Sequence, residues 1–481
     1  LNKMGKVKKR WLILFCVIFG ISVLGLFFSG STSDFNLPAL TAQQYANIAW
    51  MITATIFVLM MTPGLAFFYG GMVRAKNVIS TMLQSFIVMG VVSVIWVVVG
   101  FSLSFGNDVC GLIGNPADFF MMKGVGVGNL LPVGSSGAGL TQQDLAVTTI
   151  PLALFALFQM KFAIITPSLI TGSFAERVKF SGYLIFMMLW VLVVYCPLAH
   201  WTWHPEGIFA KMHVHDFAGG IVVHAASGVA ALVGALFLGK RTSDEGKAAN
   251  IPFVLLGAAL LWLGWFGFNG GSSLAADGVA ISAFLNTNTA AATAMVTWVF
   301  LDCLLGRHPS AMGAAIGAVV GLVAITPSAG WVTVGQSFFI SFVTTIICNF
   351  AVTYKAKKHL FDDALDVFPT HGLGGIVGTI LTGVFTYSYF FPEGDGEISR
   401  LGFFINHVLA VVIVFGYTFV MSYALYWLTN KMVRMRVSKR SERIGLDRSQ
   451  HAEEYGGDFS GTEIAEEVPS REEWMKSVSE N

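Results

Sequence analysis

The chain has 481 residues, of which 55% are hydrophobic and only 12% are charged, and its formal net charge is +1. Because soluble proteins carry about 25% charged residues, this composition excludes an ordinary soluble globular protein, and the balanced charge gives no sign of a nucleic-acid partner. The charges gather in short loops and in the C-terminal tail, which leaves neutral stretches long enough to cross a membrane. We therefore expect an all-α polytopic membrane protein.

The first segment has the features of a secretory signal. KVKKR at residues 6–10 precedes a long apolar stretch, and the small residues SGSTS follow at 29–33. A basic start, an apolar stretch and small residues are typical of a signal peptide, so residues 1–33 are predicted to be a signal peptide-like segment cleaved near 29–33. The apolar stretch is long for a signal peptide, which leaves an uncleaved anchor as the alternative.

From residue 45 onward, the apolar stretches and the loops between them predict eleven transmembrane helices. Eleven basic residues lie in the loops after odd-numbered helices, and three lie in the opposite loops. By the positive-inside rule, the mature N-terminus is outside and the C-terminus is inside. The predicted helices are centred near Val58, Val92, Phe158, Met188, Ala230, Leu261, Ala294, Val319, Phe342, Ile380 and Tyr417.

Two pairs of segments resemble each other across the chain. GLAFFYGG at 64–71 resembles GWFGFNGG at 264–271, and DFAGGIVVH at 216–224 has a looser counterpart in DVFPTHGLGGIVG at 366–378. Five helices reverse the direction of the chain, so the pattern predicts a five-plus-five inverted repeat with an extra last helix. Such transporters bind their substrate near the membrane midplane, between the halves. Chance similarity of glycine-rich segments is the alternative.

Two histidines lie within predicted membrane helices, where polar groups are costly and often functional. His224 lies in the fifth helix and His371 begins the tenth, and glycines at helical spacing beside them let another helix approach closely. A single buried histidine is usually structural. Two histidines at matching places in a possible repeat favour a narrow path in which imidazoles exchange hydrogen bonds with a small polar solute.

Aromatic and polar side chains gather toward the outer side. HWTWHPEG places Trp203 at the outer end of the fourth helix, and the spacing in LGWFGFNGGSS puts three side chains on one helical face. Aromatic faces attract cations, and a serine hydroxyl accepts a hydrogen bond from an ammonium group. Membrane anchoring and core packing are the alternatives. The residues on shared faces are Trp265, Phe268 and Ser272 in the sixth helix, and Gln159 and Phe162 in the third.

Six segments, in chain order, resemble the sequence blocks of the ammonium transporter (Amt/Mep/Rh) family, in its bacterial Amt branch. The similarity runs from about residue 45 to residue 456. It implies a membrane domain at 45–432 and a cytoplasmic C-terminal tail at 433–481. The segments are FFYGGMVRAKN, FQMKFAIITPSLITGSFAERV, DFAGGIVVHAASGVAALVGALFLGKR, GWFGFNGGS, DDALDVFPTHGLGGIVG and RIGLDRSQHAEEY.

The resemblance implies an ammonium transporter or channel in the cell (inner) membrane, with eleven helices in each subunit of a homotrimer. It implies contact with membrane lipid, no enzyme activity, no cofactor and no metal, and a possible PII-type regulatory partner at the tail. The roles that it implies are an outer ammonium site of Trp203, Ser272, Phe162 and Asp216, a gate of Phe162 and Phe268, a pore lined by His224 and His371, and support from Gln159 and Trp265.

Ammonium is expected to bind outside, lose a proton, and cross as ammonia between the histidines, because desolvation disfavours its charged form. Lys161, next to Phe162, is expected to face away from the pore and to find an acidic group, a carbonyl or lipid headgroups. Two alternatives remain open. One is an ammonium sensor with a blocked pore, and the other is an Rh-like gas channel, although Trp203 and GWFGFNGGS do not favour the latter.

Overall fold

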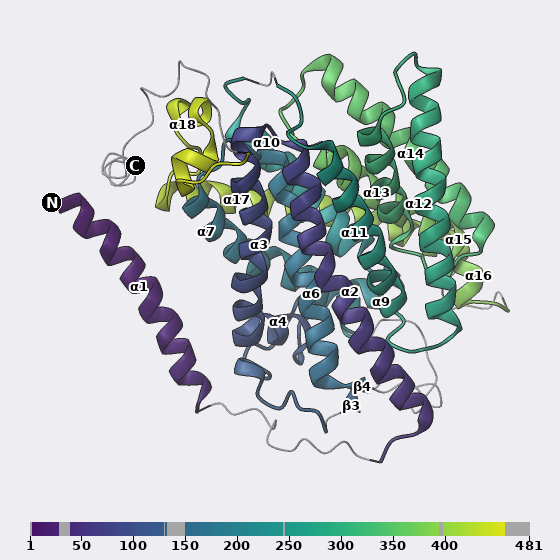
Figure 1. Ribbon diagram of the computed structural model, residues 1–481. Coiled ribbons are helices and arrows are strands. Elements are labelled where there is room, and N and C mark those ends of the chain that lie inside the picture. The colour runs from purple at the N-terminus through teal and green to yellow at the C-terminus, as the bar shows by residue number, and fades with distance from the viewer. Residues whose placement is uncertain are drawn as a thin grey trace.

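The computed structural model describes residues 2–27, 39–128, 130–131, 150–243, 246–393 and 398–456. Over these residues the chain is largely helical, and the long helices after α1 stand side by side in one bundle, whereas α1 stands apart at the left of the view (Figure 1). The described strands form two short antiparallel hairpins: β1 (Asp108–Val109) with β2 (Ile113–Gly114), and β3 (Leu130–Leu131) with β4 (Ile150–Pro151).

The helices of the described chain have the following bounds. The N-terminal part holds α1 (Asn2–Gly25), α2 (Ala42–Met72), α3 (Val78–Ile95), α4 (Phe101–Phe105), α6 (Leu152–Ile170), α7 (Phe180–Trp190), α8 (Cys196–Trp203), α9 (Ile208–Lys211), η6 (Gly220–Ala225) and α10 (Ala226–Leu238). The C-terminal part holds α11 (Ile251–Gly271), α12 (Gly278–Leu304), α13 (Ala311–Ile325), α14 (Val334–Lys358), η7 (Phe368–Gly372), α15 (Leu373–Phe385), α16 (Tyr387–Phe390), α17 (Arg400–Met432), α18 (Lys439–Ile444) and η8 (Asp447–His451).

Ten helical segments in the described part of the chain are long and apolar enough to cross a membrane. They account for ten of the eleven predicted helices. The remaining prediction, centred near Val319, corresponds to α13, an apolar helix of 15 residues. The predicted fold class, an all-α polytopic membrane protein, is confirmed. The predicted cleavage near residues 29–33 lies outside the described residues.

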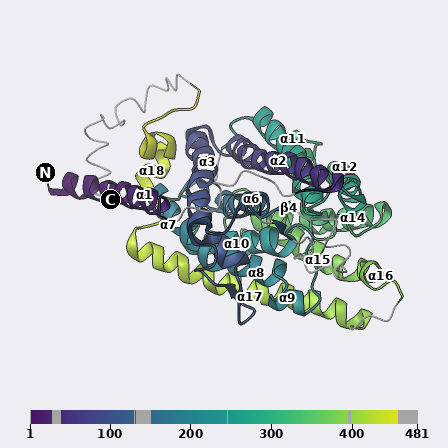
Figure 2. The same ribbon diagram turned by 90° about the horizontal axis from the view of Figure 1, so that it is seen from below.

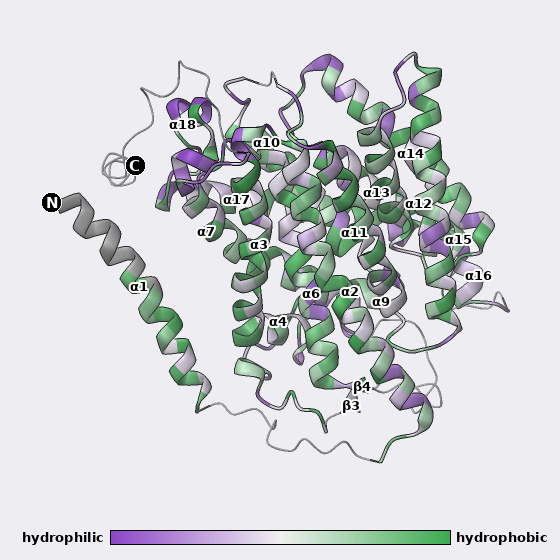
Figure 3. Cartoon of the chain, viewed as in Figure 1, coloured by the Kyte–Doolittle hydropathy of each residue, from purple (hydrophilic) through white to green (hydrophobic). Residues whose placement is uncertain are grey.

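The hydropathy of the residues changes along the length of the bundle. Hydrophobic residues run along the bundle helices, and hydrophilic residues gather at their ends, most densely around α18 (Figure 3). Large apolar side chains are exposed along the bundle surface, such as Ile52 and Ile56 on α2 and Phe338 and Phe342 on α14. An apolar exterior of this kind suits a lipid environment, in which helices satisfy their own backbone hydrogen bonds.

Several long helices begin at a residue whose side chain accepts a backbone hydrogen bond. Thr41 before α2 and Thr333 before α14 each form a capping box with the glutamine three residues later. Asn250 and Asp277 cap α11 and α12 through a single side-chain acceptor. Local sequence therefore fixes where these helices start.

Glycines set the closest helix crossings. α2 packs antiparallel against α11, and a Cβ at Gly257 would lie 2.2 Å from the backbone nitrogen of Phe68. The start of α10 meets η7 in the same way, because a Cβ at Gly228 would lie 2.2 Å from both Cα and N of Gly372. The view from below (Figure 2) shows α10 and α6 inside the bundle, surrounded by other helices. Small residues at such crossings let helix backbones touch.

The segment after α17 lies against the bundle end near α3 and α7. Asp447 accepts hydrogen bonds from the backbone N–H groups of Ile79 (3.0 Å) and Ser80 (2.7 Å) at the start of α3. Burial raises the pKa of Asp447 to about 6, against hydrogen bonds from α3 that lower it. Because this folded-state pKa is raised, Asp447 stabilises docking most when protonated, and that contribution falls as the pH rises toward 6.

Further contacts join this segment to the loops. Arg436 donates a hydrogen bond to the backbone carbonyl of Leu238 at 2.8 Å, and Tyr455 accepts a hydrogen bond from the side chain of Asn250 at 2.7 Å. Nearby, Glu176 pairs with Arg74 and Arg241. Burial by itself raises the pKa of Glu176, but the hydrogen bond and charge of Arg74 and the charge of Arg241 hold that pKa below its ordinary value.

We predict that Gly228→Ala destabilises the protein by about 3 kcal/mol or more, because the new methyl group overlaps the backbone of Gly372. Thermal unfolding of purified protein in detergent measures the effect. Gly416→Ala is the matched control, since a Cβ at Gly416 on α17 meets nothing within 4 Å. Equal melting temperatures for the two variants would contradict the prediction.

Candidate functional site

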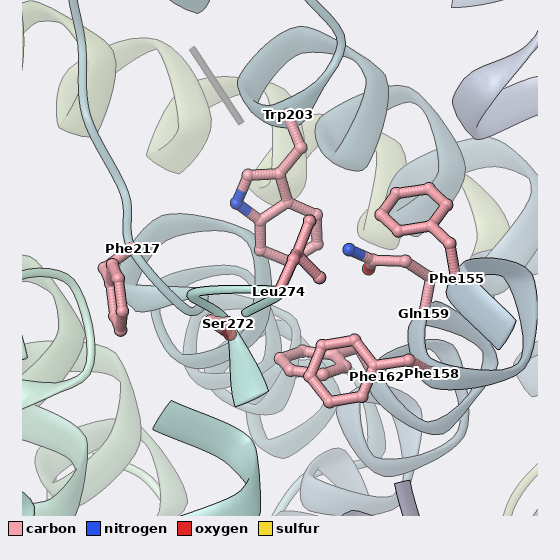
Figure 4. A pocket seen from close by; sticks show the side chains of 8 residues that line it. All are labelled: Phe155, Phe158, Gln159, Phe162, Trp203, Phe217, Ser272 and Leu274. Atoms are coloured by element: carbon pink, nitrogen blue, oxygen red, sulfur yellow. The ribbon is translucent and has the colours of Figure 1, made fainter. Parts of the chain in front are cut away.

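A pocket lies at the end of α6 and α8, and four of the predicted site residues line it. Figure 4 shows the α6 side chains on one side and Phe217 on the other, with Trp203 between them. The predicted residues in its wall are Gln159, Phe162, Trp203 and Ser272, and the wall is completed by Phe155, Phe158, Phe217 and Leu274.

Trp203 is held in place by its own indole nitrogen. Nε1–H donates a hydrogen bond to the backbone carbonyl of Asp216 at 2.9 Å, and the ring meets Phe162 edge-on, with centroids 5.9 Å apart. Because this bond uses the only polar group of the indole, the side chain offers its π surface to the pocket. Such a surface attracts a cation, and the attraction grows where water is excluded.

Two polar acceptors complete the pocket wall. The Ser272 hydroxyl donates to the carbonyl of Phe268 at 2.8 Å, so its lone pairs remain able to accept. The Oε1 atom of Gln159 is buried and has no hydrogen-bond partner within the described ranges. An ammonium ion carries four donors and no acceptor, which complements this pair of acceptors.

Phe162 and Phe268 close the inner end of the pocket. Their rings stack with centroids 4.2 Å apart and planes 23° from parallel, and both side chains are buried. Phe158 contacts the Phe162 ring edge-on at 4.9 Å. The two rings predicted to form a gate therefore lie against each other.

The two predicted pore histidines meet below this stack. Nδ1 of His371 lies 3.4 Å from Nδ1 of His224, and both side chains are buried. Two facing nitrogens share one hydrogen, so one ring donates and the other accepts. Nε2 of His224 has no hydrogen-bond partner among the described residues.

The rings form one continuous series. We call Trp203, Phe162, Phe268, His224 and His371 the ring column. Successive centroids lie 5.9, 4.2, 6.1 and 5.5 Å apart. The column leads from the pocket to the histidine pair in the interior of the bundle.

Trp265 supports the column from the side. Its ring stacks on His224 with centroids 5.3 Å apart, and its Nε1–H donates to Thr326 Oγ1 at 2.9 Å. The structure thus brings Trp265 to the pore histidines rather than to the pocket wall, where Gln159 lies.

Asp216 fixes the start of the helix that carries His224. Its two carboxylate oxygens accept hydrogen bonds from Gly219 (2.8 Å), Gly220 (2.6 Å), Ile221 (2.7 Å) and Val222 (3.4 Å). Gly219 has a φ of +119°, which L side chains rarely adopt. A carboxylate also suits the positive end of a helix dipole. Asp216 therefore shapes the site through the backbone and does not line the pocket.

Asp363 is the corresponding residue for His371. It stands eight residues before His371, as Asp216 stands eight before His224. Its Oδ2 atom accepts a hydrogen bond from the N–H of Phe368, the first residue of η7, at 2.8 Å. The looser sequence alignment matched Asp216 to Asp366 and missed this residue. The equal distance from aspartate to histidine is the signal that could have found it.

Phe155 and Phe158 were also missed as pocket residues. They stand four residues before Gln159 and Phe162, so the face that those two define already included them. Phe217 and Leu274 come from loops, where helical spacing gives no guide.

Lys161 is buried but does not line the pocket, in agreement with the expectation that it faces away. The expected acidic or carbonyl partner is not found in the described part of the chain. The nearest polar contact of Nζ is the sulfur of Met160 at 3.8 Å. No group of three or more metal-ligating side chains occurs among the described residues.

A polytopic helical bundle with an aromatic, acceptor-lined pocket above two buried histidines defines a membrane transporter or channel for a small cation or its neutral form. The Ammonium Transporter Family model matches residues 49–455, and the chain belongs to that family.

Relatives agree with this assignment. The chain is 42% identical over 411 residues to the "Putative ammonium transporter" of Methanothermobacter thermautotrophicus, covering 85% of this chain and 97% of the relative. It is 40% identical over 415 residues to the "Ammonium transporter" of Bacillus subtilis, covering 85% and 98%. The chain is therefore an ammonium transporter and a multi-pass membrane protein, and not an enzyme, as predicted.

Solved structures are similar as well. Saccharomyces cerevisiae Mep2 matches with a TM-score of 0.71 and 30% identity, covering 83% of this chain and 88% of that one. A "Sensor Amt Protein" matches with a TM-score of 0.74 and 29% identity, covering 85% and 99%.

We predict that Asp216→Ala abolishes ammonium uptake, because four buried N–H groups lose their acceptor and the helix that carries His224 loses its anchor. Uptake into proteoliposomes measures it. Asp277→Ala is the control, since Asp277 caps α12 and does not contact the site. Near-normal uptake by folded Asp216→Ala protein would remove Asp216 from the mechanism.

Proposed function

We propose that this transporter binds ammonium in the outer pocket, deprotonates it, and conducts ammonia past the gate and between His224 and His371. The observation that carries the proposal is the ring column, whose successive ring contacts lead from the pocket to the buried histidine pair. Trp203, Phe162, Ser272 and Gln159 bind the ion. The released proton either stays on the outer side or crosses by a separate route, and the current measurement described below distinguishes the two.

The energetics favour ammonia as the species that crosses. Moving a bare cation into a water-free interior costs several kcal/mol even after relaxation. An uncharged polar molecule costs about 2–7 kcal/mol without hydrogen bonds, and less when imidazole nitrogens bond to it. Desolvation at the gate also destabilises charged ammonium relative to neutral ammonia, which favours loss of the proton there. Potassium has no proton to lose and is excluded.

The histidine pair suits the passage of a neutral solute. With Nδ1 facing Nδ1, one ring offers a donor and the other a lone pair. Nε2 of His224, which has no other partner in the described chain, can bond to ammonia on either its donor or its acceptor side. A neutral pair neither repels nor traps an uncharged solute.

We also propose the inverted repeat and the orientation indicated by the basic loops. The antiparallel crossing of α2 with α11 and the paired caps by Asp216 and Asp363 support the repeat. The pocket then faces outward, and the tail faces the cytoplasm. The homotrimer and the inner membrane follow the family resemblance, and the cleaved N-terminal segment follows the signal-like sequence of residues 1–33. The exposed apolar helix faces supply surface for lipid and neighbouring subunits.

We also propose that the tail, residues 433–481, is the contact site for a regulatory protein, such as one of PII type. Its support is the docking of residues 433–456 on the cytoplasmic ends of the helices, through Asp447, Arg436 and Tyr455. A partner that pulls on this segment also pulls on α3 and on the loop before α11. The acidic stretch beyond residue 456 lies outside the described residues.

We expect deletion of residues 434–481 to reduce flux or remove its regulation while leaving membrane insertion intact, because no predicted membrane helix is cut. Deletion of 457–481 alone is the matched control, since it keeps every docking contact described above. Flux in proteoliposomes and PII binding are the measurements. Unchanged flux and unchanged PII binding in the longer deletion would reduce the tail to a solvated extension.

His371→Glu is expected to let potassium pass. A buried carboxylate offsets the cost of desolvating a cation and draws water into the pore. Replacing both His224 and His371 by alanine is expected to lower ammonium transport without loss of ammonium binding at Trp203 and Ser272. Paired ammonium and potassium currents on purified protein in bilayers measure both effects.

The outcomes of this experiment distinguish the alternative functions. If the glutamate variant excludes potassium and the alanine pair conducts like wild type, the histidines are structural. Ammonium binding to wild type with neither current nor uptake identifies a blocked sensor. Uptake without current identifies electroneutral passage of ammonia.

A further inference from the structure

The loop that carries Asp216 is fixed at three successive residues by three different parts of the chain: the end of α8, the turn after α13, and α17. The backbone carbonyl of Asp216 accepts from Trp203, and the N–H of Phe217 donates to the carbonyl of Pro327 at 3.0 Å. The N–H of His215 donates to a side chain of the last helix, α17: Nε2 of His407, at 3.1 Å. The helix outside the repeat therefore contacts the site loop.

The hydrogen bonds of His407 define its form. Nδ1 lies 2.9 Å from the carbonyl of Phe403, which can only accept, so Nδ1 carries the hydrogen. Nε2 faces an N–H group, so it holds the lone pair. His407 is a neutral imidazole with two distinct tasks: Nδ1 anchors the ring to its own helix, and Nε2 holds the loop.

Packing leaves His407 no other position. Its side chain is fully buried, and a Cβ at Gly383 on α15 would lie 2.9 Å from the His407 Cβ. The preceding residue adds a second bond, because Nδ2 of Asn406 donates to the carbonyl of Met212 at 2.7 Å. Asn406 and His407 together hold both ends of the loop segment 212–215. The His215 ring is stacked on Phe390, with centroids 3.7 Å apart.

We propose that His407 is a positioning residue for the ammonium site: through the His215 backbone it sets the place of Asp216, and with it the Trp203 indole. The inference rests on the proposed function, in which Trp203 binds ammonium. The consequence is specific. Loss of the Nε2 contact releases the loop beneath Trp203 and weakens ammonium binding, whereas loss of the Nδ1 contact changes only the link between His407 and its own helix.

Two amide substitutions separate the tasks of the ring nitrogens. The amide of asparagine occupies the place of Nδ1 and cannot reach that of Nε2, so His407→Asn keeps the Phe403 contact and loses the loop. The amide of glutamine reaches the place of Nε2, and its oxygen accepts from the His215 N–H. We expect His407→Asn to raise the half-saturating ammonium concentration about tenfold, since it leaves a buried N–H unpaired. We expect His407→Gln to stay near the wild-type value.

The half-saturating concentration and the maximal rate are measured from ammonium uptake into proteoliposomes, with the melting temperature recorded for each variant. A purely structural role lowers the melting temperature or the maximal rate in both variants and leaves half-saturation unchanged. Equal half-saturation in the asparagine and glutamine variants, at any value, overturns the proposal. Asn406→Ala removes the other loop contact and is expected to raise the half-saturating concentration by a smaller factor. It is the substitute test if His407→Asn does not fold. A wild-type half-saturating concentration in Asn406→Ala then overturns the proposal.

Trp203→Ala distinguishes this proposal from the one on which it rests. If Trp203→Ala has the wild-type half-saturating concentration, the proposed binding site is wrong. If Trp203→Ala raises it and His407→Asn does not, the binding site stands and the role of His407 is overturned. The half-saturating concentrations of His407→Asn and His407→Gln, compared with each other, decide the role of His407 in either case.

Discussion

The close approach of α10 to η7 is the constraint on which the rest of the site depends. Gly228 and Gly372 leave no room for even one methyl group between the two backbones. That contact brings His224 and His371 to within 3.4 Å, although 147 positions separate them in the chain. The other rings of the column follow from this pair, since Phe268 packs on His224, Phe162 packs on Phe268 and Trp203 packs on Phe162.

The buried carboxylates beside this contact act on the backbone. Asp216 and Asp363 each accept hydrogen bonds at the start of a helix that carries one of the two histidines. A buried charge is tolerated only when hydrogen bonds or opposite charges surround it, and a helix N-terminus supplies both donors and a favourable dipole. The Asp216 carboxylate is directed at backbone N–H groups and not at the path between the histidines. This arrangement fits a path for a neutral solute.

The end of the bundle that carries the segment after α17 is organised by charges instead of rings. Glu176, Arg74 and Arg241 form a compact group between loops, and Asp362 extends it through Arg241. The docked segment after α17 joins this side through Asp447 at the start of α3. The ring column and the ionic contacts occupy different parts of the bundle, so the selectivity and the regulation that we propose rest on separate interactions.

The sequence by itself determined the membrane class, ten of the membrane helices and the residue types of the site, because apolar length and helical spacing are local properties. Phe162, Phe268, Trp203 and Ser272 could be named from spacing and family resemblance, and the structure brings them together. Tertiary structure alone decided that Trp265 stacks on His224 and that the N–H of His215 in the site loop donates to His407 of the last helix. The Trp265 and His407 contacts join segments that are far apart in the chain, by 192 positions in the case of His215 and His407. The loop residues Phe217 and Leu274 have no periodicity to reveal them. Lys161 shows the same limit: its sequence position predicted where it points, but only packing decides which atoms surround it.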